Sequence, residues 1–341
     1  MDIQQALAAI VDRQNLTAEQ MKAVMNQIMT GNATDAQIGG LLIALRMKGE
    51  TVAEITGAAD GMRALATPVS VQAENAVDIV GTGGDGSNLF NVSSASSFVV
   101  AAAGGNVAKH GNRSVSSSSG AADLLEAAGV NLAITPEQVG RCIDEVGVGF
   151  MFAPQHHSAM KYAIGPRKEM GLRTLFNILG PLTNPASAKH YLLGVFDKTL
   201  CRPMAEALQA LGAKHALVVH ASDGLDELSL ATDSFVAELK DGAISEYTIN
   251  ATDAGLEVQS LDGLQVNGSA ESRALIEAAF AGENMKAVDM IALNAGAAIY
   301  AADLADTLQA GVAKAKETIL SGAAAAKMKQ LAEFTQGFKG E

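Results

Sequence analysis

The chain has 341 residues, of which 48 % are hydrophobic and 18 % charged, a composition that suits two folded domains with a large core and excludes a disordered polymer. Its formal net charge of −13 repels nucleic-acid phosphates over most of the surface, so an anionic ligand must meet a local cationic cluster. Two cysteines are too few for a disulfide framework, and we find no signal peptide or run of about 18 apolar residues, so we expect a cytoplasmic protein without a membrane span.

Residues 1–68 are predicted to form a helical domain. Gly31 and Gly49 are typical of positions that follow a helix end. Three pairs match the capping box, in which two side chains three residues apart satisfy free amides at a helix start: Thr17 with Gln20, Thr34 with Gln37, and Thr51 with Glu54. A small helical bundle is therefore expected here.

From residue 74 to residue 336 the pattern changes to strands that alternate with helices. The expected strands are residues 76–80, 106–110, 147–153, 191–196 and 216–221. This alternation predicts an α/β fold with a mostly parallel sheet covered by helices. Residues 235–265 alternate apolar and polar side chains around a DG turn, which indicates antiparallel strands at an edge, and residues 269–336 are predicted to be helical.

Two polar loops follow the first two expected strands. The first, residues 81–94, contains glycines that let backbone amides approach an anion, and then polar residues at a helix start: Gly81, Gly83, Gly84, Asn91, Ser93 and Ser94. It matches neither common glycine motif for nucleotides, and taken alone it could equally be a tight turn before a capped helix. The ligands of a parallel sheet gather at the carboxyl ends of its strands, which is where this loop falls.

The second loop, KHGNRSVSSSSG at residues 109–120, offers a cationic lining and a run of hydroxyls. Lys109, His110 and Arg113 are followed by Ser116 to Ser119 at the start of the next helix, a suitable lining for a phosphate group. A solvated serine linker is the alternative. It fits less well, because the segment lies between a strand and a helix only about ten residues apart.

Charged residues elsewhere give two further candidates. Asp223, Asp226 and Glu227 follow the strand at 216–221 and could hold Mg²⁺ that bridges substrate phosphates, although such a loop can also be merely solvated. In the segment 162–185, one of three cations could clamp a carboxylate, and the sequence alone does not choose among Arg167, Lys168 and Arg173. The remaining histidines and the cysteines are interpreted as structural: His156, His157, His190, His215, His220, Cys142 and Cys201.

Four of these segments, GTGGD, KHGNRSVSSSSG, RKEMGLRTLFNILGPLTNP and DGLDE, together resemble the anthranilate phosphoribosyltransferase family. The similarity covers essentially the whole chain. It implies a homodimer with a nucleoside-phosphorylase-like phosphoribosyltransferase fold. In that fold a small helical domain is hinged to a larger α/β domain, and we expect residues 162–185 to pack on the helical domain. It also implies transfer of the 5-phosphoribosyl group from 5-phosphoribosyl 1-diphosphate (PRPP) to the amine of anthranilate, with release of diphosphate, in tryptophan biosynthesis.

The resemblance also implies site residues but no nucleophile or general base. The PRPP site would comprise Gly81, Gly84, Asp85, Leu89, Asn91, Val92, Ser93, Ser94, Lys109, His110, Gly111, Asn112, Arg113, Ser114, Val115, Ser116, Ser117 and Ala121. Gly81, Asn112 and Arg167 would contact anthranilate, and Ser93, Asp226 and Glu227 would hold two Mg²⁺ ions per subunit. Leu89 and Ala121 depart from the usual Thr and Ser of the family, so at both positions only a backbone amide can contribute.

Two other functions are considered. A pyrimidine nucleoside phosphorylase of the same fold would bind free phosphate and a nucleobase, but the DGLDE loop and the paired phosphate-type loops favour a ribose that carries two phosphate groups. A nonenzymatic relative that binds nucleic acid is disfavoured by the net charge of −13 and the lack of a basic stripe. The expected partners are thus small-molecule substrates, with no nucleic acid and no membrane.

Overall fold

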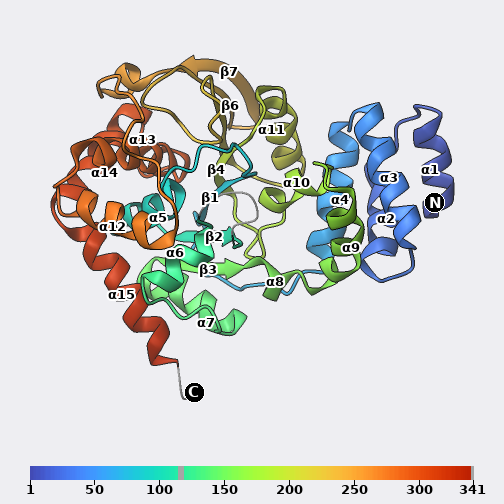
Figure 1. The fold of residues 1–341 in the computed structure, drawn as a ribbon, viewed down its shortest axis with the longest axis horizontal. Coiled ribbons are helices and arrows are strands. Elements are labelled where there is room, and N and C mark those ends of the chain that lie inside the picture. The colour runs from blue at the N-terminus through green and yellow to red at the C-terminus, as the bar shows by residue number, and fades with distance from the viewer. Residues whose placement is uncertain (114–118, 339–341) are drawn as a thin grey trace.

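The N-terminal region of the computed structural model, which describes residues 1–113 and 119–338, is a bundle of four helices. They are α1 (Ile3–Val11), α2 (Ala18–Met29), α3 (Asp35–Lys48) and α4 (Val52–Ala64). The three predicted capping boxes begin α2, α3 and α4, and a fourth, formed by Asp2 and Gln5, begins α1. Helix α9 (Lys161–Met170) packs against α2 and α3, although it begins more than 100 residues after they end (Figure 1). The predicted helical bundle is confirmed.

A seven-stranded sheet forms the centre of the α/β part, with the order β3-β2-β1-β4-β5-β6-β7. The strands are β1 (Val77–Gly81), β2 (Val107–Gly111), β3 (Val148–Phe152), β4 (His190–Gly194), β5 (His215–Ala221), β6 (Ser234–Lys240) and β7 (Ala243–Ile249). Strands β1 to β5 are parallel, and β6 and β7 pair antiparallel at one edge. The predicted α/β fold is therefore confirmed.

The predicted antiparallel region was too long. Strand β6 ends at Lys240 and β7 at Ile249, and a short helical turn, Ala251–Ala254, follows where strand was expected. Beyond that turn, Gln265 pairs with Leu89 in an isolated antiparallel bridge, and the backbone amide of Phe90 donates to the carbonyl of Leu264. The end of this segment therefore pairs with the first polar loop instead of extending the sheet.

Helices cover both faces of the sheet (Figure 1). Between the strands lie α5 (Val92–Ala102), α6 (Ala121–Ala127), α7 (Pro136–Arg141), α8 (Ala153–His156), α10 (Phe176–Leu179) and α11 (Cys201–Ala210). The C-terminal helices are α12 (Ser269–Phe280), α13 (Met285–Ala301), α14 (Leu308–Leu320) and α15 (Ala323–Gly337). Among the helices in the described ranges, none is both long and apolar enough to cross a membrane.

Alternating side chains of the strands divide the core into two large clusters, as the period of two in a strand requires. Ile79, Leu192 and Leu217 point to the face covered by α5 and α13, whereas Leu193 and Val218 belong to a cluster that continues into the N-terminal bundle. Cys142 and Cys201 are buried in these two clusters as free thiols. The bundle and one face of the sheet thus share an apolar core.

Candidate functional site

The carboxyl ends of the parallel strands meet at one edge of the sheet, where the acidic loop after β5 lies across two neighbouring strands. Gly81 ends β1 and Gly194 ends β4. A Cβ atom at Gly81 would collide with the carboxylate of Asp226, and a Cβ atom at Gly194 would collide with the backbone of Asp226. The backbone amide of Gly83 donates a hydrogen bond of 2.7 Å to Oδ2 of Asp226. Asp226 therefore fixes the loop after β1, here called the glycine loop (residues 82–88). Gly194 was missed because no local motif marks it.

Burial and mutual repulsion perturb the carboxylates of this loop. Burial and the charge of Asp85 raise the pKa of Asp226 to about 6. Burial and the charges of Asp226 and Asp85 raise the pKa of Glu227 well above its ordinary value, while Lys109 and the backbone amide of Ser93 act in the opposite direction. The structure thus brings together Ser93, Asp226 and Glu227, the three residues that the resemblance suggests as metal ligands.

These residues fit part of a divalent-cation site. Among the described residues, no three His, Cys, Asp or Glu side chains come together as a complete metal site. Mg²⁺ is commonly held by one or two carboxylates together with waters and substrate phosphates, and Asp226 with Glu227 offers that number of carboxylates. Their raised pKa values, caused first by burial, show that the charged forms of both carboxylates are costly here, and a cation would offset this cost.

Lys109 supplies a buried cation beside these carboxylates. Only 4 % of the residue is exposed, and its Nζ donates to the carbonyl of Ile79 at 2.5 Å and to Oγ of Ser93 at 3.2 Å. Burial lowers its pKa to about 8, and the charges of Asp78, Glu227 and Asp226 limit that shift. The cation therefore lies between the end of β2 and the start of α5.

Asn91 joins the first polar loop to the second. Helix α5 begins after it without a side-chain cap among the described residues. Instead, the Asn91 side chain donates to the carbonyl of Ser119 at 3.1 Å and accepts hydrogen bonds of 2.7 Å from the hydroxyls of Ser119 and Ser272. Because the amides at a helix start attract anions, the beginning of α5 at Val92 is a suitable phosphate position.

The second polar loop is described only in part, because Ser114, Val115, Ser116 and Ser117 lie outside the described residues. Arg113 is exposed, and its guanidinium pairs with Asp123 at 3.0 Å and Glu126 at 2.6 Å. Oδ1 of Asn112 accepts a hydrogen bond of 2.8 Å from the amide of Arg113. Two carboxylates of α6 thus already engage this arginine, which sets it apart from Lys109.

Two histidines from distant segments of the chain meet beside these loops. The rings of His110 and His157 lie 5.1 Å apart, and Nδ1 of His110 is 3.2 Å from the carbonyl of Gly180. Burial lowers the pKa of His110 to about 3 and that of His157 to about 4, so both rings are neutral at physiological pH. Each Nε2 is buried without a partner among the described residues, which indicates a place for a ligand or water. The interpretation of His157 as structural agrees with its burial, and its contact with His110 was not predicted.

The three cations of the segment 162–185 differ in their surroundings. Arg173 donates to the carbonyl of Gly84 and is already engaged, and Lys168 is exposed on α9. Arg167 is partly buried, with its guanidinium 5.3 Å from the ring centre of Phe176, and has no carboxylate partner within the described ranges. Burial lowers its pKa. Arg167 is thus the candidate best suited to take a carboxylate from a ligand.

The remaining site residues hold the loops in shape. The carboxylate of Asp85 accepts a hydrogen bond of 2.6 Å from the hydroxyl of Ser87. Leu89 and Ala121 are partly buried against the core on the α5 side of the sheet. Ser94 is buried on α5, and its Oγ has no partner among the described residues. A Cβ at Gly111 would come within 2.8 Å of the Phe150 ring, so the end of β2 packs closely on β3.

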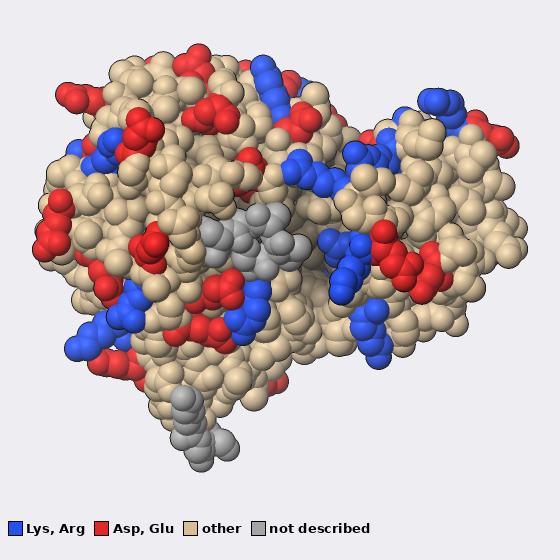
Figure 2. Space-filling view, viewed as in Figure 1, with Lys and Arg blue, Asp and Glu red and all other residues tan. Residues whose placement is uncertain are grey.

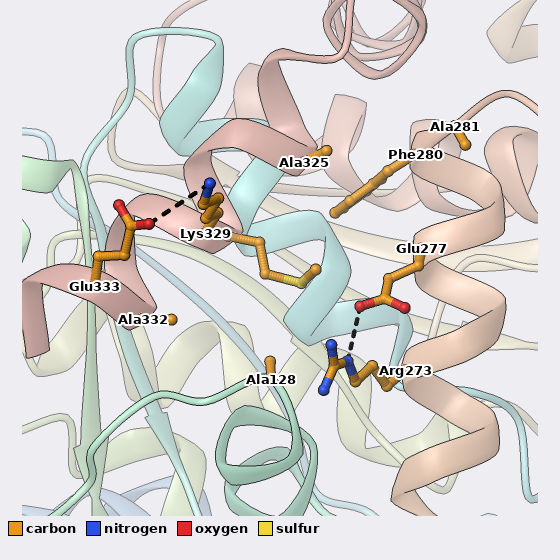
Figure 3. Close-up of a pocket in the computed structure, with 10 residues that line it drawn as sticks. Ala128, Arg273, Glu277, Phe280, Ala281, Ala325, Lys329, Ala332 and Glu333 are labelled. Carbon is orange, nitrogen blue, oxygen red and sulfur yellow. Dashed lines mark hydrogen bonds and ion pairs between the residues drawn. The ribbon is translucent and has the colours of Figure 1, made fainter. Parts of the chain in front are cut away.

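Two hollows in the described surface are compared as places for a substrate. Figure 2 shows one between the helical bundle and the α/β part, with Lys and Arg side chains along the bundle side. A second, of about 400 Å³, lies between α12 and α15 (Figure 3). The charges at this second hollow are already paired, Arg273 with Glu277 at 2.7 Å and Lys329 with Glu333 at 3.6 Å. The strand ends beside the first hollow are therefore the better candidate site for an anionic substrate.

Comparisons with known proteins agree along the whole chain. Residues 4–66 match a family model described as "Glycosyl transferase family, helical bundle domain", and residues 73–325 match its "a/b domain". The chain is 63 % identical to the anthranilate phosphoribosyltransferase of Hahella chejuensis, with 100 % of both chains covered. It is 61 % identical to that of Saccharophagus degradans, covering 98 % of this chain and 99 % of the relative.

Solved structures show the same fold. The crystal structure of anthranilate phosphoribosyltransferase from Thermus thermophilus is 43 % identical and covers 97 % of this chain and 99 % of its own, with a TM-score of 0.92. The enzyme from Saccharomyces cerevisiae in complex with PRPP and Mg is 24 % identical, covers 98 % of each chain and has a TM-score of 0.89. At that lower identity, the likeness concerns the fold.

Proposed function

We infer that this chain, which belongs to the anthranilate phosphoribosyltransferase family, transfers the 5-phosphoribosyl group of PRPP to the amine of anthranilate and releases diphosphate, a step of tryptophan biosynthesis. The structural observation that carries this function is the meeting of Asp226, Glu227 and Lys109 at the carboxyl ends of the strands. Paired carboxylates and a buried cation suit a substrate that is itself a diphosphate. Loss of anthranilate fluorescence in the presence of PRPP and Mg²⁺ tests this function.

PRPP is proposed to lie along the glycine loop, the start of α5 and the end of β2. The glycine loop offers backbone amides, α5 offers the amides at its start at Val92, and Lys109 offers a buried positive charge. Arg113 contributes to phosphate binding only if it leaves the two carboxylates that it pairs with. Ser114 to Ser117 remain proposed phosphate contacts from the resemblance alone.

Mg²⁺ is proposed as the cofactor, with two ions per subunit. Asp226, Glu227 and Ser93 are the residues that would hold it, because they converge at one end of the sheet. When bound, it would neutralise negative charge on the diphosphate oxygens. Asp226 by itself lies against both strand ends, with its carboxylate beside Gly81 and its backbone beside Gly194.

The residues of the chain are proposed to act by charge and orientation. Breaking the bond between ribose C1 and diphosphate builds negative charge on the leaving group, which Lys109 and the amides at the start of α5 stabilise. The aromatic amine of anthranilate is neutral at pH 7, so no strong general base is needed and none is assigned. Its proton can leave late, to water or to diphosphate.

Anthranilate is proposed to bind through its carboxylate to Arg167, with Asn112 and Gly81 as further contacts. A guanidinium can form two parallel hydrogen bonds with a carboxylate, which would turn the amine toward C1. The partial burial of Arg167 and its stacking over Phe176 support this role. The unpartnered Nε2 atoms of His110 and His157 offer neutral polar contacts beside the same loops.

The alternative functions remain testable. A pyrimidine nucleoside phosphorylase would cleave nucleosides with free phosphate, and we expect no such activity. A salt-dependent DNA titration should likewise show no binding, because the net charge is −13. Measurable phosphorolysis of a pyrimidine nucleoside would favour the alternative enzyme. We propose a cytoplasmic location, in agreement with two buried free cysteines.

A homodimer is also proposed, through the outer face of the helical bundle. Val11 on α1, Met47 on α3 and Ile164 on α9 are 66 %, 74 % and 56 % exposed, and a dimer interface would remove these apolar side chains from water. Light scattering should give twice the 35.0 kDa mass of one chain. Ile164→Glu should shift this mass toward that of one chain, whereas Val258→Glu, at an apolar residue 56 % exposed outside the bundle, should not. A monomeric wild-type protein would contradict the proposal.

A further inference from the structure

Arg173, in the segment between α9 and α10, contacts three parts of the molecule that are far apart in the sequence. Its guanidinium donates a hydrogen bond to the carbonyl of Gly84 in the glycine loop. The same guanidinium lies over the ring of Phe196, 4.3 Å from the ring centre. Its backbone carbonyl accepts a hydrogen bond from Arg46, near the end of α3 in the helical bundle. Arg173 therefore lies between the bundle and the glycine loop.

Phe196 also contacts the first half of the glycine loop. The amide of Thr82 donates to the carbonyl of Gly194 at 2.9 Å, and the hydroxyl of Thr82 accepts a hydrogen bond of 3.0 Å from the amide of Phe196. The start of the loop is thus tied to the end of β4. Arg173 then extends from the Phe196 ring to the carbonyl of Gly84, two residues further along the loop.

The glycine at position 84 suits this contact in two ways. Its φ of +81° lies in the left-handed region, which side chains other than glycine rarely adopt. A Cβ atom there would also approach Nη2 of Arg173 to 3.0 Å. The opposite side of the loop is held by Asp226 at the amide of Gly83. The peptide groups before Gly83 and after Gly84 are therefore fixed by side chains from two different segments.

We propose that Arg173 is a positioning residue, which holds the glycine loop in the shape that binds PRPP and relays the position of α3 to that loop through Arg46. This inference rests on the proposed function, because it takes the glycine loop as part of the PRPP site. Arg173 and Arg46 are both exposed, so their contacts add little to the stability of the fold. Their loss should therefore change the loop and leave the core intact.

Steady-state kinetics of Arg173→Gln test the positioning role. We expect the KM for PRPP to rise about fivefold to tenfold, the size expected for loss of one hydrogen bond and one stacked cation, with the KM for anthranilate changed less than about twofold. Arg173→Lys keeps a donor but loses the planar stack, so it should lie between wild type and Gln. An unchanged KM for PRPP, or equal rises for both substrates, would overturn the proposal.

A matched control is Arg202→Gln on α11, an exposed arginine that pairs with Glu206 and Glu246, and its kinetics should equal those of wild type. Thermal unfolding of each variant identifies any loss of the fold. If the wild-type protein itself shows no PRPP-dependent activity, the proposed function fails. If wild type is active and Arg173→Gln matches it, only the positioning role fails.

Combining Arg46→Gln with Arg173→Gln tests the relay. Arg46→Gln alone should raise the KM for PRPP by about twofold to fivefold, because it releases the carbonyl of Arg173. In the Arg173→Gln background, the same change should have little further effect, since the contact with Gly84 is already lost. Fully additive effects of the two substitutions would contradict the relay.

Discussion

The carboxylate of Asp226 accepts a hydrogen bond of 2.7 Å from the backbone amide of Gly83, a residue that lies 143 positions earlier in the chain. One side chain thus has two possible tasks, because it shapes the glycine loop and is also a candidate ligand of Mg²⁺.

Asp226→Asn separates charge from geometry, because the amide oxygen can still accept the hydrogen bond from Gly83. We expect kcat/KM to fall by about a hundredfold or more, and the Mg²⁺ concentration for half-maximal rate to rise at least about tenfold. Asp233→Asn, an exposed residue before β6, is the control. An unchanged Mg²⁺ dependence in Asp226→Asn would rule out the proposed metal role.

Arg167→Ala tests the carboxylate contact of anthranilate. The KM for anthranilate should rise about tenfold to a hundredfold, because a paired charged hydrogen bond is lost, while the KM for PRPP changes far less. Lys168→Ala, at the exposed neighbouring residue of α9, should leave both values near wild type. Equal effects of Arg167→Ala on the two substrates would assign it a general structural role.

Gly194→Ala tests the close approach of β4 to the acidic loop. A Cβ at Gly194 would collide with the backbone of Asp226, so that loop must move. We expect a loss of about 1–3 kcal/mol in the free energy of unfolding and a weaker Mg²⁺ response. Gly337→Ala, where a Cβ meets no atom within 4 Å, should cause neither change. A wild-type Mg²⁺ response in Gly194→Ala would show that the loop tolerates the extra carbon.

The hydrogen bonds of Glu238 should make the free energy of unfolding depend on pH in the acidic range. Burial raises its pKa, but hydrogen bonds from His215, Tyr300 and Tyr247 outweigh burial and lower the pKa from 4.5 to about 2. Because the folded-state pKa is lowered, this stabilisation is present above pH 4.5 and is lost as the pH falls toward 2. By linkage it amounts to roughly 3 kcal/mol.

Denaturant unfolding of Glu238→Gln at several pH values measures this effect. The difference in the free energy of unfolding between wild type and variant should be largest near pH 7 and shrink steadily below pH 4.5. Glu246→Gln, an exposed residue of β7 paired with Arg202, should differ from wild type by less than about 1 kcal/mol. A difference for Glu238→Gln that does not depend on pH would contradict the lowered pKa.

Local patterns in the sequence predicted much of the fold and the loops of the site. Capping boxes such as Thr17 with Gln20 involve residues three apart, and parallel strands bring the loops after them to one edge of a sheet. The loops that carry Ser93 and the pair Asp226 and Glu227 could therefore be expected at one edge of the sheet, whereas the grouping of the three residues as one metal site came from the family resemblance. The signal for these residues lies in segments that are each short and continuous in the chain.

What the sequence did not predict depends on contacts between distant segments. Gly194 matters because Asp226 crosses it, and His157 matters because its ring meets that of His110. The sequence also did not show which of the three cations in the segment 162–185 contacts the glycine loop. The structure shows that it is Arg173, which donates to the carbonyl of Gly84. No periodicity or short motif records such pairs, because each residue's role is set by a partner elsewhere in the chain.

Loss of anthranilate fluorescence is the most direct test of the central claim. Purified protein is mixed with anthranilate, PRPP and Mg²⁺, and parallel samples lack PRPP or contain Asp226→Asn in place of wild type. We predict that fluorescence falls in the complete wild-type mixture, stays constant without PRPP and falls much more slowly with the variant. Constant fluorescence in the complete mixture would contradict the proposed function.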